Sequence, residues 1–113
     1  RFRLGIVSNF YGNLEQVCIE TGLAPLMSVL IDSACVGFVK PDPRIFRAAL
    51  TQLRLDPQEA IFVGDSLPRD MKGAKGLGMP HVWFVPDRSD PLVPCCPDDP
   101  TIQSLSDLRE VLL

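Results

Sequence analysis

Residues 60–70 read AIFVGDSLPRD and contain the clearest buried strand of the sequence. The apolar run Ala60-Ile61-Phe62-Val63 has the length and the lack of alternation that are typical of a strand covered on both faces. We expect the strand to end at Gly64-Asp65, because a glycine and a carboxylate interrupt the apolar run. A helix then begins near Pro68, since proline is favoured in the first turn of a helix. The stretch therefore predicts a strand followed at once by a helix.

Strands and helices alternate on both sides of this stretch. Short apolar runs predict further strands at residues 4–7, 28–31 and 81–85. Helical spacing of apolar residues predicts helices over 14–21, 43–53, 68–77 and 106–113. A chain in which strands and helices alternate forms parallel crossovers. The sequence thus predicts a three-layer α/β/α, Rossmann-like fold with a parallel sheet.

The helix ends carry recognisable signals. Asn13 precedes the first helix and Asp42 precedes the second, where both side chains are suited to capping. Pro43 follows Asp42 at the first helical position, which proline favours. Gly22 and Gly78 follow the first and third helices, where a glycine ends a helix in the left-handed conformation.

Length and charge limit the function classes. The chain has 113 residues, which is one small domain. Its 11 Lys and Arg against 14 Asp and Glu give a net charge of −3, which argues against nucleic-acid binding. No apolar run is long enough to span a membrane, and no signal segment is visible, so we expect a cytoplasmic protein. Residues 86–100 are rich in proline and are expected to form a long irregular loop.

The four cysteines do not have the paired spacing of a zinc site. Cys18 and Cys35 lie within apolar patterns and are interpreted as small core residues. Cys95 and Cys96 are adjacent, and free thiols are expected in a reducing compartment. His81, the single histidine, begins an apolar run, where a structural or surface histidine is favoured over a catalytic one.

Polar residues gather where the predicted strands end. Ser8-Asn9 follows the first strand, Lys40 comes after the second, and Asp65 with Asp70 follows the third. In a parallel α/β sheet the chemistry lies at the carboxyl ends of the strands. Two carboxylates suit Mg²⁺, which proteins hold with one or two carboxylates plus water and phosphate. A hydroxyl and an ammonium near that metal favour phosphoryl transfer.

Each of these residues also has a plainer interpretation. Ser8-Asn9 is compatible with an ordinary turn, and Lys40 with a solvated loop charge. Asp65 and Asp70 are compatible with a helix cap and a charge that favours the helix dipole. Arg44 is interpreted as a surface charge or as one member of a local ion pair. These polar residues, in this order at successive strand ends, indicate a functional site more strongly than any one of them does alone.

Three motifs in order resemble those of the haloacid dehalogenase-like (HAD) hydrolase superfamily. Residues 6–9 (IVSN) are similar to the second motif, 40–46 (KPDPRIF) to the third motif and 62–70 (FVGDSLPRD) to the fourth. The resemblance implies that Ser8 and Asn9 bind the transferred phosphoryl group and that Lys40 is catalytic and balances its charge. It also implies that Asp65 is a direct, catalytic Mg²⁺ ligand and that Asp70 supports the metal.

One motif of the superfamily is missing from the chain. Its first motif, Asp-x-Asp, supplies the nucleophile, and no Asp-x-Asp follows any predicted strand here. The substrate-selecting cap between the first and second motifs is missing as well. We therefore expect residues 1–113 to be the C-terminal part of a core domain that lacks its first central strand. The expected partner is the N-terminal half of the enzyme, or a second copy paired through exposed strand edges.

The resemblance implies a Mg²⁺-dependent phosphohydrolase that cleaves a small phosphorylated metabolite through an aspartyl-phosphate. The nucleophile would lie outside the chain, so this chain alone is expected to be inactive. Two alternatives stay open. One is a dehalogenase of the same family, which the carboxylate pair disfavours because carbon–halogen cleavage needs no cation. The other is a non-catalytic binding or assembly module with a truncated fold.

Overall fold

The computed structural model describes residues 2–86 and 100–112. The chain divides into two compact units, residues 1–56 and 57–113. Among the described residues, no helix combines the length and the apolar character needed to cross a membrane.

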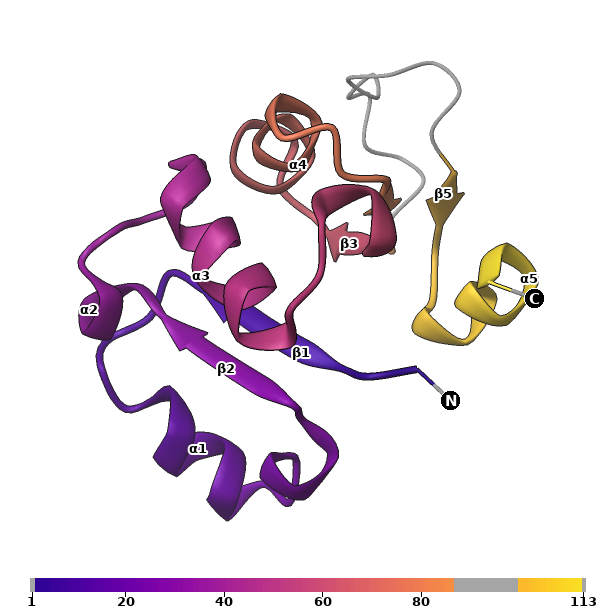
Figure 1. The fold of residues 1–113 in the computed structure, drawn as a ribbon. Coiled ribbons are helices and arrows are strands. Elements are labelled where there is room, and N and C mark those ends of the chain that lie inside the picture. The colour runs from indigo at the N-terminus through magenta and orange to yellow at the C-terminus, as the bar shows by residue number, and fades with distance from the viewer. Residues whose placement is uncertain (1, 87–99, 113) are drawn as a thin grey trace. The chain divides into compact units, whose positions relative to one another are not determined.

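The first unit is built on two parallel strands, β1 (Gly5–Ser8) and β2 (Val29–Asp32). Helix α1 (Leu14–Glu20) connects them, and α3 (Pro43–Leu53) lies on the opposite side of this small sheet (Figure 1). A 3₁₀ turn, Ala24–Leu26, precedes β2, and a short helix, α2 (Ser33–Val36), follows it directly. The two strands end together, because Ser8 pairs with Asp32 in the register.

The core of the first unit forms where α1 and α3 meet β2. Apolar residues recur on one face of α3, so that face is covered by the sheet while the other stays in solvent. Each fully buried Ile or Phe side chain contributes about 1.5–3 kcal/mol of stability. The buried apolar residues of this unit are Leu14, Cys18, Val29, Ile31, Ile45, Phe46, Ala49 and Leu50.

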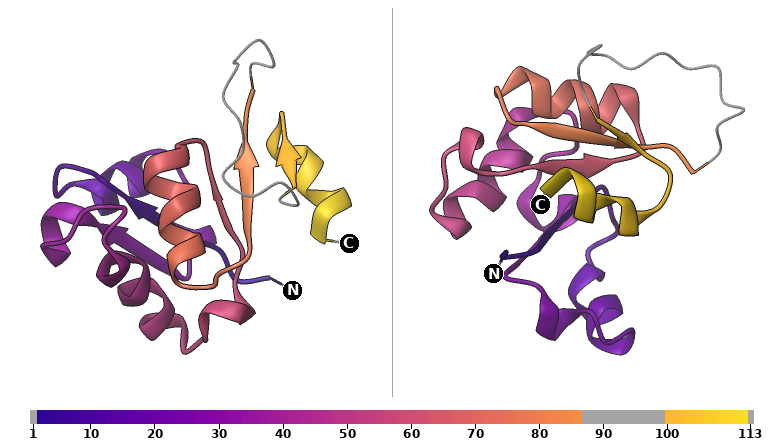
Figure 2. Two further views of the ribbon diagram at one scale, coloured as in Figure 1. Left: turned by 90° about the horizontal axis from the view of Figure 1, so that it is seen from above. Right: turned by 90° about the vertical axis from the view of Figure 1, so that its right-hand side faces the viewer.

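The second unit holds three parallel strands in the order β3 (Phe62–Gly64), β4 (His81–Phe84) and β5 (Thr101–Ile102). Figure 2 shows β5 beside β4. A π-helical turn, Leu67–Met71, follows β3 and continues into α4 (Lys72–Gly76). Helix α5 (Leu108–Leu112) ends the unit, and 3₁₀ turns precede β3 (Pro57–Glu59) and α5 (Leu105–Asp107).

The core of the second unit joins the π-helical turn to the sheet. Met71 from that turn packs with Trp83 and Val85, and Phe62 and Leu67 cover the cluster. His81 is buried at the start of β4, and its Nδ1 lies 2.9 Å from the Met79 carbonyl oxygen. Of the two interpretations of His81, structural or surface, its burial supports the structural one and contradicts the surface one.

The predicted fold class is confirmed, since helices alternate with strands and all strand pairs are parallel. The described strands form two sheets, β1-β2 and β3-β4-β5. Within the described residues, β1 therefore pairs only with β2 and β3 pairs only with β4. β1 and β3 each have one edge to which no described strand is hydrogen-bonded.

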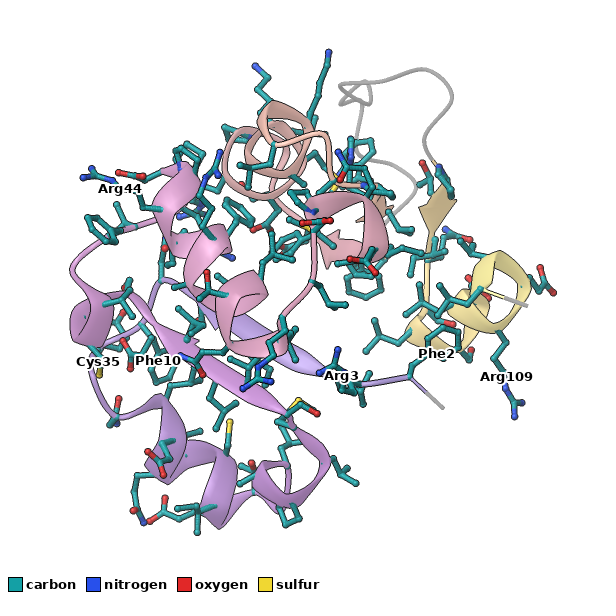
Figure 3. All side chains as sticks on the ribbon, in the orientation of Figure 1. Phe2, Arg3, Phe10, Cys35, Arg44 and Arg109 are labelled. Carbon is teal, nitrogen blue, oxygen red and sulfur yellow. The ribbon has the colours of Figure 1, made fainter. Side chains whose placement is uncertain are left out.

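Several local predictions need correction. Cys35 is exposed, because it lies on the outer side of α2, whereas Cys18 is buried as expected. Figure 3 shows the Cys35 sulfur at the surface. The sequence did not predict α2 or β5. Most of the predicted loop over 86–100, with Cys95 and Cys96, lies outside the described residues.

Candidate functional site

Ser8 and Asn9 lie at the carboxyl end of β1. Ser8 is the last residue of the strand, and both residues are half-buried. The strand ends here because polar residues replace the apolar run. The sheet therefore fixes the main chain of the residue that bears the Ser8 hydroxyl.

Asn9 is hydrogen-bonded to the main chain of Lys40. Its side-chain Oδ1 accepts from the Lys40 N–H at 2.7 Å, and its Nδ2 donates to the Lys40 carbonyl oxygen at 3.3 Å. The two residues are 31 positions apart in the sequence, so these bonds join separate loops. The structure thus brings together the second and third motif regions at one end of the first unit.

Asp32 and Ser33 hold the loop that follows β1. Asp32 is buried, and its Oδ2 accepts from the N–H groups of Gly12 at 2.8 Å and Leu14 at 3.1 Å. Its Oδ1 accepts from the Ala34 N–H at 2.9 Å. The Ser33 hydroxyl accepts from the Phe10 N–H at 2.9 Å and donates to the Phe10 carbonyl oxygen at 3.2 Å.

These bonds explain how α1 begins. Asn13 occupies the expected N-cap position, but its side chain makes no capping hydrogen bond. The N–H of Leu14, the first helical residue, donates to Asp32. A buried carboxylate is stable when N–H donors surround it, because they replace the hydrogen bonds of water. The start of α1 is therefore held by a residue distant in sequence, whose bond goes to the first helical N–H and not to the second or third, which an Asn13 cap would bind.

The segment after Lys40 has a local ion pair. Asp42 caps α3 by accepting from the Arg44 N–H at 2.9 Å, and the Arg44 Nη2 lies 2.7 Å from Asp42 Oδ2. The hydrogen bonds from Arg44 lower the pKa of the Asp42 carboxyl below its ordinary value. The Arg44 guanidinium also lies over the Phe38 ring, 4.2 Å from its centroid, at the start of α3 (Figure 3). The local roles predicted for Asp42 and Arg44 are confirmed.

In the second unit, Asp65 directly follows β3 and is exposed. Its carbonyl oxygen accepts a hydrogen bond from the indole Nε1 of Trp83 at 3.1 Å. The helix cap is Ser66, whose hydroxyl accepts from the Arg69 N–H. The alternative interpretation of Asp65 as that cap is therefore wrong, and its exposed carboxylate is not used in capping.

Asp70 is buried and lies against both neighbours of Asp65. Its Oδ2 accepts from the Ser66 N–H at 3.1 Å. A Cβ atom added at Gly64 would lie 2.5 Å from the Cβ, Cγ and Oδ2 atoms of Asp70, so only glycine leaves room for this carboxylate. The position of the Asp70 carboxylate therefore requires a glycine at position 64.

The π-helical turn sets the direction of Asp70. The Met71 N–H bonds to the Ser66 carbonyl five residues back, at 3.1 Å, and the Asp70 N–H bonds to the same oxygen at 2.8 Å. π turns are rare and occur frequently at functional sites. Here the wider turn starts at the cap residue and returns Asp70 to the end of β3. The sequence predicted an ordinary helix at this position.

The donor set at the end of β3 fits Mg²⁺. No group of three or more His, Cys, Asp or Glu residues suited to a metal occurs among the residues that the structure describes. Mg²⁺ does not require one, because it is usually held by one or two carboxylates together with water and phosphate oxygens. The exposed Asp65 and the buried Asp70, both oxygen donors next to one strand end, match that pattern.

The predicted site residues fall into two groups. Asn9 and Lys40 are brought together in the first unit, which also carries Ser8 at the strand end. Asp65 and Asp70 are brought together in the second unit. Sequence reasoning missed Asp32, Ser33 and Trp83. A polar pair directly after an apolar run was a usable signal for Asp32 and Ser33, whereas nothing in the sequence pointed from Trp83 to Asp65.

Known proteins resemble the chain over most of its length. A family model described as haloacid dehalogenase-like hydrolase matches residues 1–78. The chain is 38% identical over 113 residues to the bovine (Bos taurus) haloacid dehalogenase-like hydrolase domain-containing protein 3, covering 97% of this chain and 45% of that protein. It is 38% identical over 111 residues to a phosphoserine phosphatase of Thermus thermophilus, covering 97% of this chain and 43% of that protein. The chain thus spans about half the length of the curated relatives it matches.

Solved structures share the fold. The crystal structure of a HAD phosphatase from Thermococcus onnurineus superimposes with a TM-score of 0.87 at 35% identity, over 98% of this chain and 50% of that chain. A 2-haloacid dehalogenase from Pseudomonas syringae gives a TM-score of 0.82 at 32% identity, over 98% of this chain and 46% of that chain. Both a phosphatase and a dehalogenase therefore share this arrangement of strands and helices.

Proposed function

The chain belongs to the haloacid dehalogenase-like hydrolases, and we propose that it forms part of a Mg²⁺-dependent phosphohydrolase acting on a small phosphorylated metabolite. The observation that carries this proposal is the pair of carboxylates at the end of β3, one exposed and one buried over Gly64. Cleavage of a carbon–halogen bond needs no cation, whereas phosphoryl transfer gains from one. The similarity to two phosphatases supports the same choice.

The metal would be held by this carboxylate pair. Asp65 would bind Mg²⁺ directly, because its carboxylate is exposed at the strand end and takes no part in capping. Asp70 would support it from its buried position beside Ser66. Bound Mg²⁺ supplies charge neutralisation and polarises a phosphoryl oxygen. The bond from Trp83 to the Asp65 carbonyl holds the main chain of that ligand in place.

The first unit would bind the phosphoryl group. The Ser8 hydroxyl is suited to donate a hydrogen bond to a phosphoryl oxygen, since it lies at the strand end and is only half-buried. The Lys40 ammonium would neutralise the charge that develops on that group in the transition state. Lys40 is therefore assigned a catalytic role, and Ser8 a binding role.

The nucleophile would be an aspartate outside these 113 residues. Its carboxylate oxygen would form a bond to phosphorus while the ester P–O bond breaks, and the leaving oxygen would take up a proton from solvent or an acidic side chain and depart as the alcohol. Water then cleaves the aspartyl-phosphate and releases inorganic phosphate. The partner that supplies the aspartate would be the N-terminal half of the enzyme, seated on strand edges such as those of β1 and β3 that are unpaired among the described residues.

Two other functions remain as alternatives. A dehalogenase is favoured by the similarity to the Pseudomonas syringae enzyme. A non-catalytic assembly module is favoured by the unpaired edges of β1 and β3 in the described chain. The three candidates differ in their need for Mg²⁺ and in their reactivity toward a phosphate ester.

The test compares this chain with the product of its complete reading frame. Both are assayed on p-nitrophenyl phosphate and on 2-chloropropionate, with Mg²⁺ and with EDTA. We expect only the longer product to hydrolyse the phosphate ester, and only with Mg²⁺. Release of chloride without Mg²⁺ would assign a dehalogenase, and inactivity of both proteins on both compounds would favour the assembly module. Hydrolysis by this chain alone would place the nucleophile within it.

A further inference from the structure

The side chain of Asn9 makes two hydrogen bonds to a single residue. Its Oδ1 accepts from the Lys40 N–H at 2.7 Å, and its Nδ2 donates to the Lys40 carbonyl at 3.3 Å. An amide side chain has an acceptor and a donor side by side, so it can match the N–H and C=O of one residue as a neighbouring strand would. We call this pair of bonds the Asn9 clasp.

The chemistry of the clasp fixes its orientation. If the Asn9 amide were rotated by half a turn, two donors would face each other at one position and two acceptors at the other. Only the observed orientation satisfies both partners. Aspartate would keep the acceptor but lose the donor, and alanine would lose both. Asparagine is thus chemically specific at this position.

The two residues that the clasp joins differ in the secondary structure around them. Asn9 lies between Ser8, which is in the sheet, and Phe10, whose N–H and C=O both bond to the Ser33 hydroxyl. Lys40 lies between α2 and α3, outside any helix or strand. The two bonds therefore restrict the position of the Lys40 main chain relative to the end of β1.

We propose that Asn9 is a positioning residue that holds the main chain of Lys40, and through it the ammonium group, rather than a ligand of the phosphoryl group. The part of this inference that concerns catalysis rests on the proposed function. It revises the role that the sequence predicted for Asn9, because both functional atoms of its amide already face Lys40. A small misplacement of a catalytic group lowers the rate by about 10²-fold.

The clasp itself is tested in the unaltered chain by NMR. A scalar coupling across the hydrogen bond, between the Lys40 amide nitrogen and the Asn9 side-chain Cγ, is expected. Its absence, with the Lys40 amide exchanging as fast as an open loop amide, would overturn the clasp. This measurement needs no variant and no activity.

Variants then separate the two bonds. Asn9→Ala should speed hydrogen exchange at the Lys40 amide by about tenfold or more, while the Gly12 amide, bonded to Asp32, stays protected. Asn9→Asp, which keeps only the acceptor, should give a smaller increase. The matched control is Asn13→Ala, because the Asn13 side chain makes no capping hydrogen bond. An equal effect of Asn9→Ala and Asn13→Ala would contradict the proposal.

The catalytic part is tested in the complete enzyme by a double-mutant cycle. Lys40→Ala is expected to lower kcat by about 10²-fold or more, and Asn9→Ala by about 10-fold to 10²-fold with little change in KM. If Asn9 acts through Lys40, the double variant loses no more than Lys40→Ala alone. Additive losses, with weaker inhibition by inorganic phosphate in Asn9→Ala, would identify Asn9 as a phosphoryl ligand. No effect of Lys40→Ala would refute the proposed role of Lys40 and leave the clasp measured by NMR intact.

Discussion

The two units of the molecule hold their chemical groups in different ways. In the first unit, side chains reach across long stretches of sequence to main-chain groups, as Asn9 does to Lys40 and Asp32 to Gly12. In the second unit, the groups that place Asp70 are close to it in sequence. The absence of a side chain at Gly64 leaves room for the Asp70 carboxylate, and the Ser66 N–H donates a hydrogen bond to it. We therefore expect the stability of the first unit to depend most on the polarity of its side chains, and the stability of the second unit to depend most on their volume.

The largest effect is expected from a change of charge in the second unit that leaves the volume unchanged. Asp65→Asn in the complete enzyme should lower Mg²⁺-dependent turnover by about 10³-fold or more, because a neutral amide is a poor Mg²⁺ ligand. Turnover of p-nitrophenyl phosphate across a Mg²⁺ titration measures it. Glu110→Gln, an exposed change in the same unit, is the control. Unaltered turnover in Asp65→Asn would remove Asp65 from the metal site.

A polarity change should destabilise the first unit. Asp32→Asn replaces a buried carboxylate that accepts three N–H groups by an amide that brings donors of its own. We expect a loss of about 3 kcal/mol in the free energy of unfolding, measured by urea denaturation. The volume barely changes, so wild-type stability in this variant would show that polarity does not hold the first unit together.

A volume change should destabilise the second unit. Gly64→Ala adds a Cβ where Asp70 already lies, and we expect a loss of about 2 kcal/mol together with weaker Mg²⁺ binding. Gly76→Ala is the matched control, since a Cβ there meets nothing within 4 Å and alanine favours the helix by about 0.5–1 kcal/mol. Equal stability of the two variants would show that steric fit is not what places Asp70.

The smallest effect is expected at the exposed pair Asp42–Arg44 in the first unit. The pKa of Asp42 is lowered in the folded chain by its hydrogen bonds to Arg44. Its contribution to stability is therefore present above the unfolded pKa of about 4 and is lost as the pH falls through the lower folded value. Arg44→Gln should return the Asp42 pKa toward its ordinary value, as followed by carboxyl NMR, with little change in stability at neutral pH. A large loss of stability at pH 7 would mean that local pairs matter in this unit as much as long-range bonds.

The sequence predicted features whose causes are local. Asp42 and Pro43 start α3 because capping and proline geometry depend on adjacent residues. Gly22 and Gly78 adopt the expected left-handed conformation, with φ of +80° and +72°. The strand ends at Ser8 and near Asp65 could also be predicted, because an apolar run stops at each of them. The proposed site in the second unit is local too, which is why Asp65 and Asp70 could be paired from the sequence.

Features that depend on distant residues were not predictable. The cap expected from Asn13 does not form, and the start of α1 is held instead by a bond from the Leu14 N–H to Asp32, which only the folded first unit brings near. The π-helical turn has nearly the same apolar spacing as an ordinary helix, so its wider hydrogen bonds leave no distinct pattern. Cys35 follows an apolar run, but the short helix α2 turns its side chain outward.

The hydrogen bond between Trp83 and Asp65 has a practical consequence for spectroscopy. The chain contains one tryptophan, and its indole donates to the carbonyl of Asp65, the residue that directly follows β3. Indole emission shifts in colour and intensity when its hydrogen bond or its polarity changes. The tryptophan fluorescence of these 113 residues is therefore a label-free optical signal from this one strand end, and it reports events there without a second tryptophan in the chain.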